Sequence, residues 1–121
     1  QELELEKVLT QNITRFLLEL GKGFAFVGRQ MPLEVGDETI YPDLLFYHLE
    51  LRCYCVIELK VQKFKPEFIG QLGTYISAVN HLKCKPGDNP TIGLAYLQDK
   101  KPSNGAICTG INKSAYRHIR V

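Results

Sequence analysis

Apolar positions near the start of the chain repeat at the spacing of a helix. Steps of three and four residues, with one adjacent pair, place these positions on one face of an amphipathic helix. They are Leu9, Ile13, Phe16, Leu17 and Leu20. Glycines at positions 21 and 23 follow directly, and glycine commonly ends a helix. The pattern therefore predicts a first helix that ends at Gly21.

The pattern then changes to short apolar runs of the kind that form strands. Segments 24–30 and 31–35 are strand-like, and 39–48 (TIYPDLLFYH) is rich in aromatic and aliphatic residues. Segment 52–61 (RCYCVIELKV) is almost continuously apolar, which is typical of a central strand covered on both faces. Turn residues at 36–38 and a short connection at 49–51 predict that these strands are joined as hairpins.

A second helix and a further buried strand complete the predicted core. Pro66 opens the helix, since proline is favoured in the first turn, and apolar positions from Phe68 to Leu82 keep the helical period. Segment 91–97 (TIGLAYL) predicts the strand, and 106–121 predicts only a short strand and a terminal segment. The order α-β-β-β-α-β, with a final strand optional, predicts an α/β fold with a mixed sheet flanked by helices.

Composition narrows the class of protein. A chain of 121 residues, 45% hydrophobic and 23% charged, suits one globular domain over residues 1–121 and excludes a disordered chain. No apolar run approaches the roughly 20 residues of a membrane span, and the acidic N-terminus does not resemble a signal peptide. Four cysteines without the spacing of a zinc site predict reduced thiols in a cytoplasmic protein.

The net charge of +2 conceals an asymmetry along the chain. Residues 1–50 carry four Lys and Arg against nine Asp and Glu, whereas residues 51–121 carry eleven against four. A basic half suggests a polyanionic partner such as nucleic acid. The alternative is a solvated surface on which the charges cluster by chance.

Two strands carry the charged residues that suggest chemistry. Side chains alternate along a strand, so Glu58 and Lys60 share a face with Val56. Asp43 and Glu58 lie seven and eight residues from the hairpin turn, so they are predicted to meet at one end of the sheet. Two carboxylates and a lysine suit Mg²⁺- or Mn²⁺-assisted cleavage of a phosphodiester bond. The alternative is a buried ion pair of Lys60 with Glu58 or Asp43 that has no catalytic role.

These residues also resemble a known signature. Pro42-Asp43, fourteen intervening residues and Glu58-Leu59-Lys60 match the PD-(D/E)XK nuclease motif. The segments ELGKGFAFVGRQ, DLLFYH, CVIELK, FKPEF and DNPTIGL resemble the C-terminal nuclease domain of the bacterial YhcG family, over roughly residues 16–97. The resemblance implies a restriction-endonuclease-like core, Mg²⁺- or Mn²⁺-dependent hydrolysis of DNA, and an upstream N-terminal domain in a larger protein. It also implies a role in DNA repair, recombination or restriction and defence.

The resemblance adds three positions to the predicted site. Nucleases of this superfamily often carry a metal-binding glutamate on the first helix, where Glu19 lies, although a surface glutamate is an equal alternative. Gln71 and Tyr75 match the Gln-x-x-x-Tyr pattern of RecB-like members, and residues four apart share a helical face. We therefore expect Gln71 to touch the site or the substrate. Tyr75 would contact the nucleic acid, but it also continues the apolar stripe, which favours a core position.

Four further residues are candidates for contacts with backbone phosphates. Arg29 and Gln30 follow the first strand, and Lys63 and Lys65 follow the Glu58-Leu59-Lys60 strand. The rival to a nuclease is a non-catalytic module that uses this fold to bind DNA or a protein. RNA cleavage or binding is a third alternative, and two cuts on a duplex would favour a homodimer.

Overall fold

The fold is a mixed β-sheet with one long helix packed across it. The computed structural model describes residues 22–99, the backbone of 106–111 and 116–120, and the helical positions Gln11, Arg15 and Leu17. Its strands and helix follow the chain in the order β1 (Phe24–Arg29), β2 (Leu33–Val35), β3 (Glu38–Ile40), β4 (Leu44–His48), β5 (Cys53–Lys60), α2 (Glu67–Leu82), β6 (Asn89–Gln98), β7 (Ala106–Ile111) and β8 (Tyr116–Arg120).

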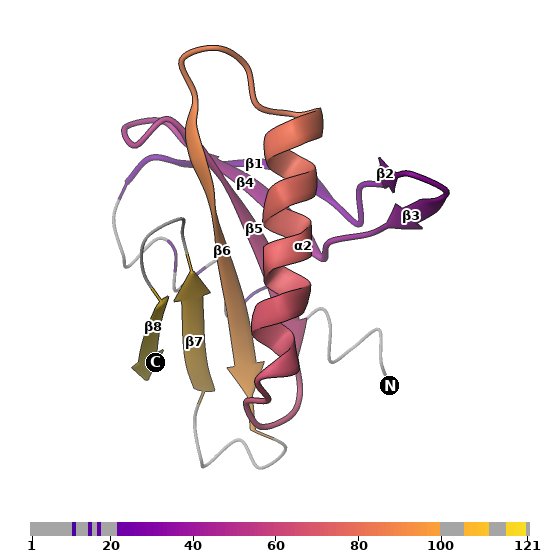
Figure 1. Cartoon of the computed structure of the whole chain (residues 1–121). Coiled ribbons are helices and arrows are strands. Elements are labelled where there is room, and N and C mark those ends of the chain that lie inside the picture. Colours follow the sequence, from indigo (N-terminus) through magenta and orange to yellow (C-terminus); the bar gives the residue numbers. More distant parts are fainter. Residues whose placement is uncertain are drawn as a thin grey trace.

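The large sheet has six strands in the order β1-β4-β5-β6-β7-β8. Neighbouring strands are antiparallel except β5 and β6, which are parallel. A parallel pair needs a crossover, and α2 provides it by running back across the sheet between these two strands (Figure 1). The end of β5 and the start of α2 therefore lie at the same end of the sheet.

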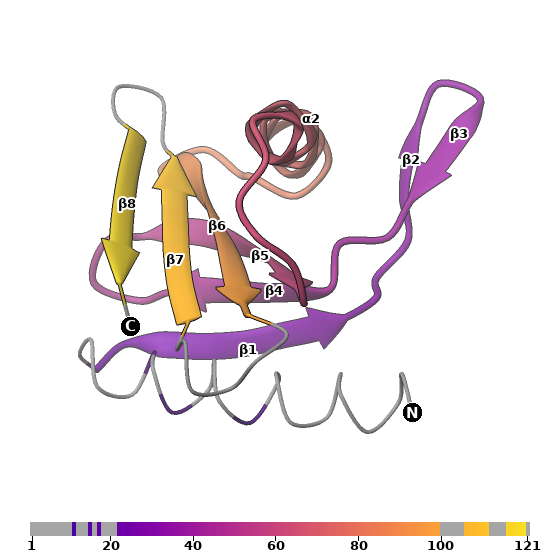
Figure 2. The ribbon, with the colours of Figure 1, turned by 90° about the horizontal axis from the view of Figure 1, so that it is seen from below.

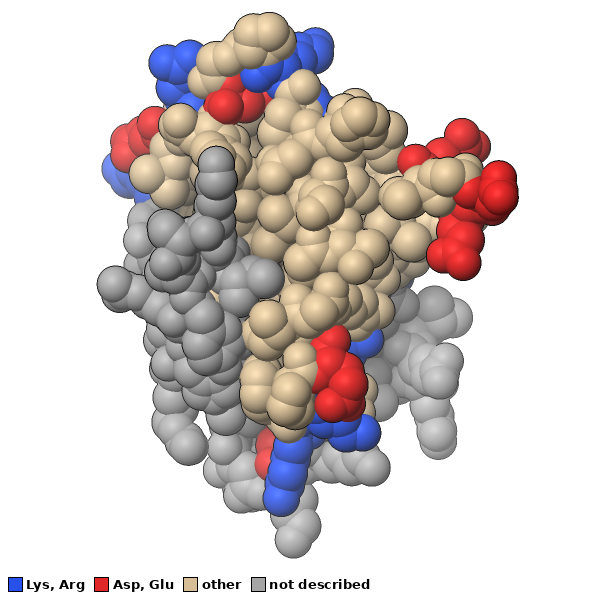
Figure 3. Space-filling view, viewed as in Figure 1, with Lys and Arg blue, Asp and Glu red and all other residues tan. Residues whose placement is uncertain are grey.

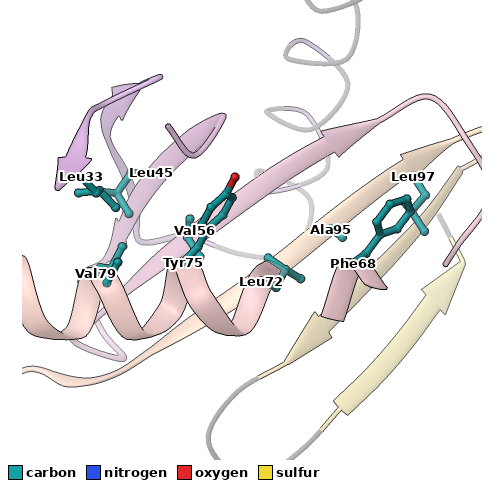
Figure 4. Packing of buried hydrophobic residues seen from close by; sticks show 10 residues of the cluster. Leu33, Leu45, Val56, Phe68, Leu72, Tyr75, Val79, Ala95 and Leu97 are labelled. Carbon is teal, nitrogen blue, oxygen red and sulfur yellow. The ribbon is translucent and has the colours of Figure 1, made fainter. Parts of the chain in front are cut away.

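The helix is held by an apolar cluster on one face of the sheet. Side chains of α2 point toward β4, β5 and β6 (Figure 4). Leu72 and Val79 of α2 are 1% and 0% exposed, so the predicted apolar stripe is the buried face of the helix. The rest of the cluster comprises Leu33, Leu45, Val56, Phe68, Tyr75, Ala78, Ala95 and Leu97.

The opposite face of the sheet buries the alternate residues of the same strands. Phe46, Cys55 and Ile57 lie there, and Leu17, which is helical, packs against them. The predicted alternation along β5 is therefore confirmed, with Val56 toward α2 and Ile57 away from it. The view in Figure 2 shows α2 on one side of the sheet only.

The predicted order of elements is wrong at two places. Segment 39–48 forms two strands, because Pro42 has no N–H for the ladder and β3 pairs only with β2. This two-stranded hairpin projects beyond the sheet beside α2 (Figures 1 and 2). The C-terminal region contributes two strands, β7 and β8, where one was predicted.

Two other predictions concern the membrane and the thiols. Within the described residues, no helix is long and apolar enough to span a membrane. Cys53, Cys55 and Cys84 are free thiols, and the first two are buried. This agrees with the prediction of reduced cysteines for the three whose side chains the structure describes.

Candidate active site

Asp43 and Glu58 meet where β4 and β5 cease to pair. The antiparallel ladder ends at the pair Leu44 and Ile57, so the next residue on each strand is one of the two acids. Pro42 precedes Asp43 and turns the chain away from the sheet toward β3. Main-chain N–H groups just beyond the ladder therefore need other acceptors.

The two carboxylates supply those acceptors reciprocally. The N–H of Asp43 donates to Oε2 of Glu58 at 2.7 Å, and the N–H of Leu59 donates to Oδ2 of Asp43 at 2.8 Å. Each acid is thus held by a main-chain donor of the opposite strand. The sequence predicted that these acids meet, and the structure confirms their proximity.

Burial makes the Glu58 carboxylate costly to ionise. Its side chain is 4% exposed. Loss of hydration and, after it, the neighbouring negative charge of Asp43 together raise the pKa of Glu58 from 4.5 to about 8. The N–H of Asp43 and the positive charge of Lys60 act in the opposite direction. A cation placed between the two acids would offset both of the unfavourable effects.

Gln30 completes the surroundings of Asp43. The side-chain Nε2 of Gln30 donates to Oδ1 of Asp43 at 2.7 Å, and the main-chain N–H of Gln30 donates to the Asp43 carbonyl at 3.1 Å. Gln30 was expected to contact a backbone phosphate, and its bond to Asp43 was not predicted. The contact depends on the pairing of β1 with β4, which places Gln30 beside Asp43 and which the sequence did not predict.

Lys60 projects from the same face of β5 as Glu58. Its Nζ lies 5.4 Å from the centroid of the Phe68 ring on α2, within the range of a cation–π interaction. Lys60 is half-buried and contributes positive charge near Glu58. Lys60 therefore lies beside the acids, although the ring beneath it was not predicted.

Gln71 and Tyr75 lie on the helical face that covers β5. Nε2 of Gln71 donates to the Tyr75 hydroxyl at 3.1 Å. Burial raises the pKa of Tyr75, and the charge of Glu58 raises it further, which places the phenol near the buried acid. Tyr75 is 9% exposed and belongs to the apolar cluster beneath α2, as its place in the apolar stripe favoured, while its predicted contact with nucleic acid stays a prediction.

The remaining predicted residues lie on or beyond the rim of this site. Arg29, Lys63 and Lys65 are exposed, and the two lysines belong to the connection between β5 and α2. In Figure 3 basic side chains lie at both ends of the molecule, at the lower end below the start of α2 and at the upper end above its C-terminal end, whereas acidic ones gather on the β2–β3 hairpin. Glu19 lies outside the described residues, so its predicted metal role stays a prediction.

The donor set suits a small hard cation with several bound waters. Among the described residues, no group of three or more His, Cys, Asp and Glu could enclose a metal ion. Asp43 and Glu58 provide two carboxylates, and Mg²⁺ commonly binds through one or two carboxylates, water and substrate oxygens. The residues present therefore fit an ion that is completed by solvent and phosphate, and they do not fit a closed structural site.

Comparisons with known proteins agree with this geometry. The family model described as the YhcG PDDEXK nuclease domain matches residues 1–109. The chain is 40% identical over 99 residues to the Escherichia coli (strain K12) protein named "Putative nuclease YhcG". That alignment covers 82% of this chain and 26% of the relative. No solved structure matches the chain significantly. With the motif acids paired at the sheet end and the family model covering most of its length, the chain belongs to the YhcG PDDEXK nuclease domain family.

Proposed function

We propose that this domain hydrolyses phosphodiester bonds in DNA with the help of Mg²⁺ or Mn²⁺ held by Asp43 and Glu58. The observation that carries the proposal is the reciprocal pairing of these acids at the end of the β4–β5 ladder. This pairing brings two carboxylates together in a domain that belongs to a nuclease family. A structural role would not call for two neighbouring acids that raise the cost of ionising Glu58.

Each residue of the site has a separate task in this proposal. Asp43 is half-buried and Glu58 is buried, so the acids would hold the ion between solvent and core. The ion, when bound, would polarise the phosphate and acidify a water molecule. Lys60 would stabilise the negative charge that develops on the phosphate, where a fixed charge is effective because it needs no reorganisation. Gln71 would orient the site through Tyr75.

The substrate class follows from the charges around the site. Lys63 and Lys65 are exposed beyond the end of β5, and residues 51–121 carry the excess of basic residues. Phosphate contacts of this kind position a nucleic acid without reading its sequence. We therefore infer that the β5–α2 connection contacts the backbone of DNA near the scissile bond.

Substitution of Lys60 tests the proposal. We expect Lys60→Ala to reduce Mg²⁺- or Mn²⁺-dependent cleavage at least roughly 100-fold while DNA affinity changes little. Asp43→Asn should be equally inactive, whereas Lys85→Ala, at the other end of α2, should cut like the wild type. Duplex, branched and single-stranded DNA and RNA should all be tried, each with both metals.

An assay of a longer form of the protein distinguishes a nuclease from a non-catalytic binding module. The chain spans 26% of the length of its relative, so the cleavage assay should be repeated with the domain joined to an upstream region. If the wild type cuts no substrate in either form, the domain is a module for binding nucleic acid or protein. If Lys60→Ala cuts as fast as the wild type, the assigned role of Lys60 is wrong.

A further inference from the structure

Gln30 contacts Asp43 through both its main chain and its side chain. Its Nε2 donates to Oδ1 of Asp43 at 2.7 Å, and its N–H donates to the Asp43 carbonyl at 3.1 Å. The N–H of Leu59 donates to the other oxygen, Oδ2, at 2.8 Å. Both oxygens of a partly exposed carboxylate are therefore held by donors from two different strand ends.

The backbone of Gln30 adopts an unusual conformation at this point. Its φ of 50° lies in the left-handed region, which is unfavourable for a residue other than glycine. Glycine would meet the requirement of the backbone at no steric cost. The presence of glutamine here indicates that the side chain is useful, and in this structure it contacts Asp43.

We propose that Gln30 is a positioning residue that holds the Asp43 carboxylate in the orientation required to bind the metal ion. This inference rests on the proposed function. A carboxylate oxygen can accept two hydrogen bonds, so one donor on each Asp43 oxygen leaves a position free for a cation. Hydrogen bonds to a ligating carboxylate orient it, and losing such a partner commonly weakens metal binding about 10- to 100-fold.

The exposed position of Gln30 distinguishes this role from a structural one. Gln30 is exposed, so shortening its side chain leaves no cavity in the core. The carboxylate of Asp43 would keep its bond from Leu59 but lose the second one, and it would then be free to rotate away. Loss of the amide should therefore affect the metal site more than the stability of the fold.

Gln30→Gly distinguishes an effect on the metal site from an effect on fold stability. The substitution removes the side-chain amide and at the same time relieves the left-handed backbone, so the fold should not be weakened while the contact with Asp43 is lost. We expect the metal-free variant to unfold at the same urea concentration as the wild type or a higher one. Its affinity for Mn²⁺, measured by titration calorimetry, should fall by about 10-fold or more. Gln30→Asn, which tolerates the left-handed region but is one methylene shorter, should show the same loss.

Arg52→Gly is the matched control. Arg52 also has a left-handed φ, 54°, but it lies in the β4–β5 turn, at the opposite end of the strands from Asp43. The Arg52→Gly variant should gain the same relief of backbone strain as Gln30→Gly and keep the Mn²⁺ affinity of the wild type. A lower affinity in Arg52→Gly would mean that backbone relief itself disturbs the site, which would overturn the assignment to the amide.

The outcomes separate this inference from the proposed function. If the wild type binds Mn²⁺, Asp43→Asn does not, and Gln30→Gly binds like the wild type, the positioning role is wrong and the metal site stands. Tighter binding by Gln30→Gly would show that Gln30 competes with the ion, which also overturns the role. If the wild type binds no Mn²⁺, the metal-dependent function and the inference fall together.

Discussion

Replacing Glu58 by glutamine should stabilise the metal-free domain, and the gain should grow as the pH rises. The glutamine Oε1 can still accept the bond from the N–H of Asp43, which is 2.7 Å from Oε2 in the wild type. The change removes a buried charge beside Asp43, and burial together with that charge raises the pKa of Glu58 from 4.5 to about 8. The buried acid therefore carries a stability cost that depends on its ionisation.

The sign and size follow from proton linkage. Between pH 4.5 and about 8 the folded state binds this proton more tightly than the unfolded state, so the free energy of unfolding falls as pH rises through that window. This loss of unfolding free energy is absent below pH 4.5 and complete above about pH 8. For this group it reaches about 2 kcal/mol at pH 6 and about 4 kcal/mol at pH 8. These two values are upper limits, because water that enters around the ionised carboxylate reduces the cost of burying it.

Urea unfolding followed by circular dichroism, in the presence of EDTA and at several pH values from 5 to 8, measures the effect. The difference in unfolding free energy between Glu58→Gln and the wild type should increase with pH, because the other titrating groups cancel in the comparison. Glu50→Gln, which removes an exposed acid in the β4–β5 turn, should differ from the wild type by a constant amount. A difference for Glu58→Gln that is the same at pH 5 and pH 8 would refute the reasoning.

Three other predictions concern the metal, the DNA and the packing of α2. Mn²⁺ affinity should rise about tenfold per pH unit up to about pH 8 and then level off, since the buried glutamate must lose its proton to bind the ion; calorimetry showing no pH dependence would contradict this. Replacing Lys63 and Lys65 by alanine should weaken DNA binding and reduce the slope of log affinity against log salt by about two. Gly93→Ala should destabilise the fold by about 1–3 kcal/mol, because its Cβ would lie 2.8 Å from Cδ1 of Ile76. Gly73→Ala, with nothing within 4 Å of the new Cβ, should instead stabilise α2 by up to about 1 kcal/mol; equal effects in a urea titration would contradict the packing argument.

The sequence by itself determined the features that depend on local periodicity. Alternation along 52–61 assigned Val56 and Ile57 to opposite faces, and the structure places them there. Counting residues from a short hairpin turn predicted that Asp43 and Glu58 meet, because the register of an antiparallel pair follows from its turn. The helical spacing of apolar positions from Phe68 to Leu82 likewise predicted the buried face of α2, although Leu82 at its end is exposed.

Tertiary structure decided whatever depends on partners far apart in the chain. Pro42 is a local reason for 39–48 to divide, but only the fold shows that the first part of this segment, β3, pairs with β2. The raised pKa of Glu58 needs the helix that excludes water and the neighbouring Asp43. Gln30 reaches Asp43 only because β1 pairs with β4. A sequence shows which residues can carry charge or donate a hydrogen bond, whereas hydration and hydrogen-bond partners depend on which elements the fold brings into contact.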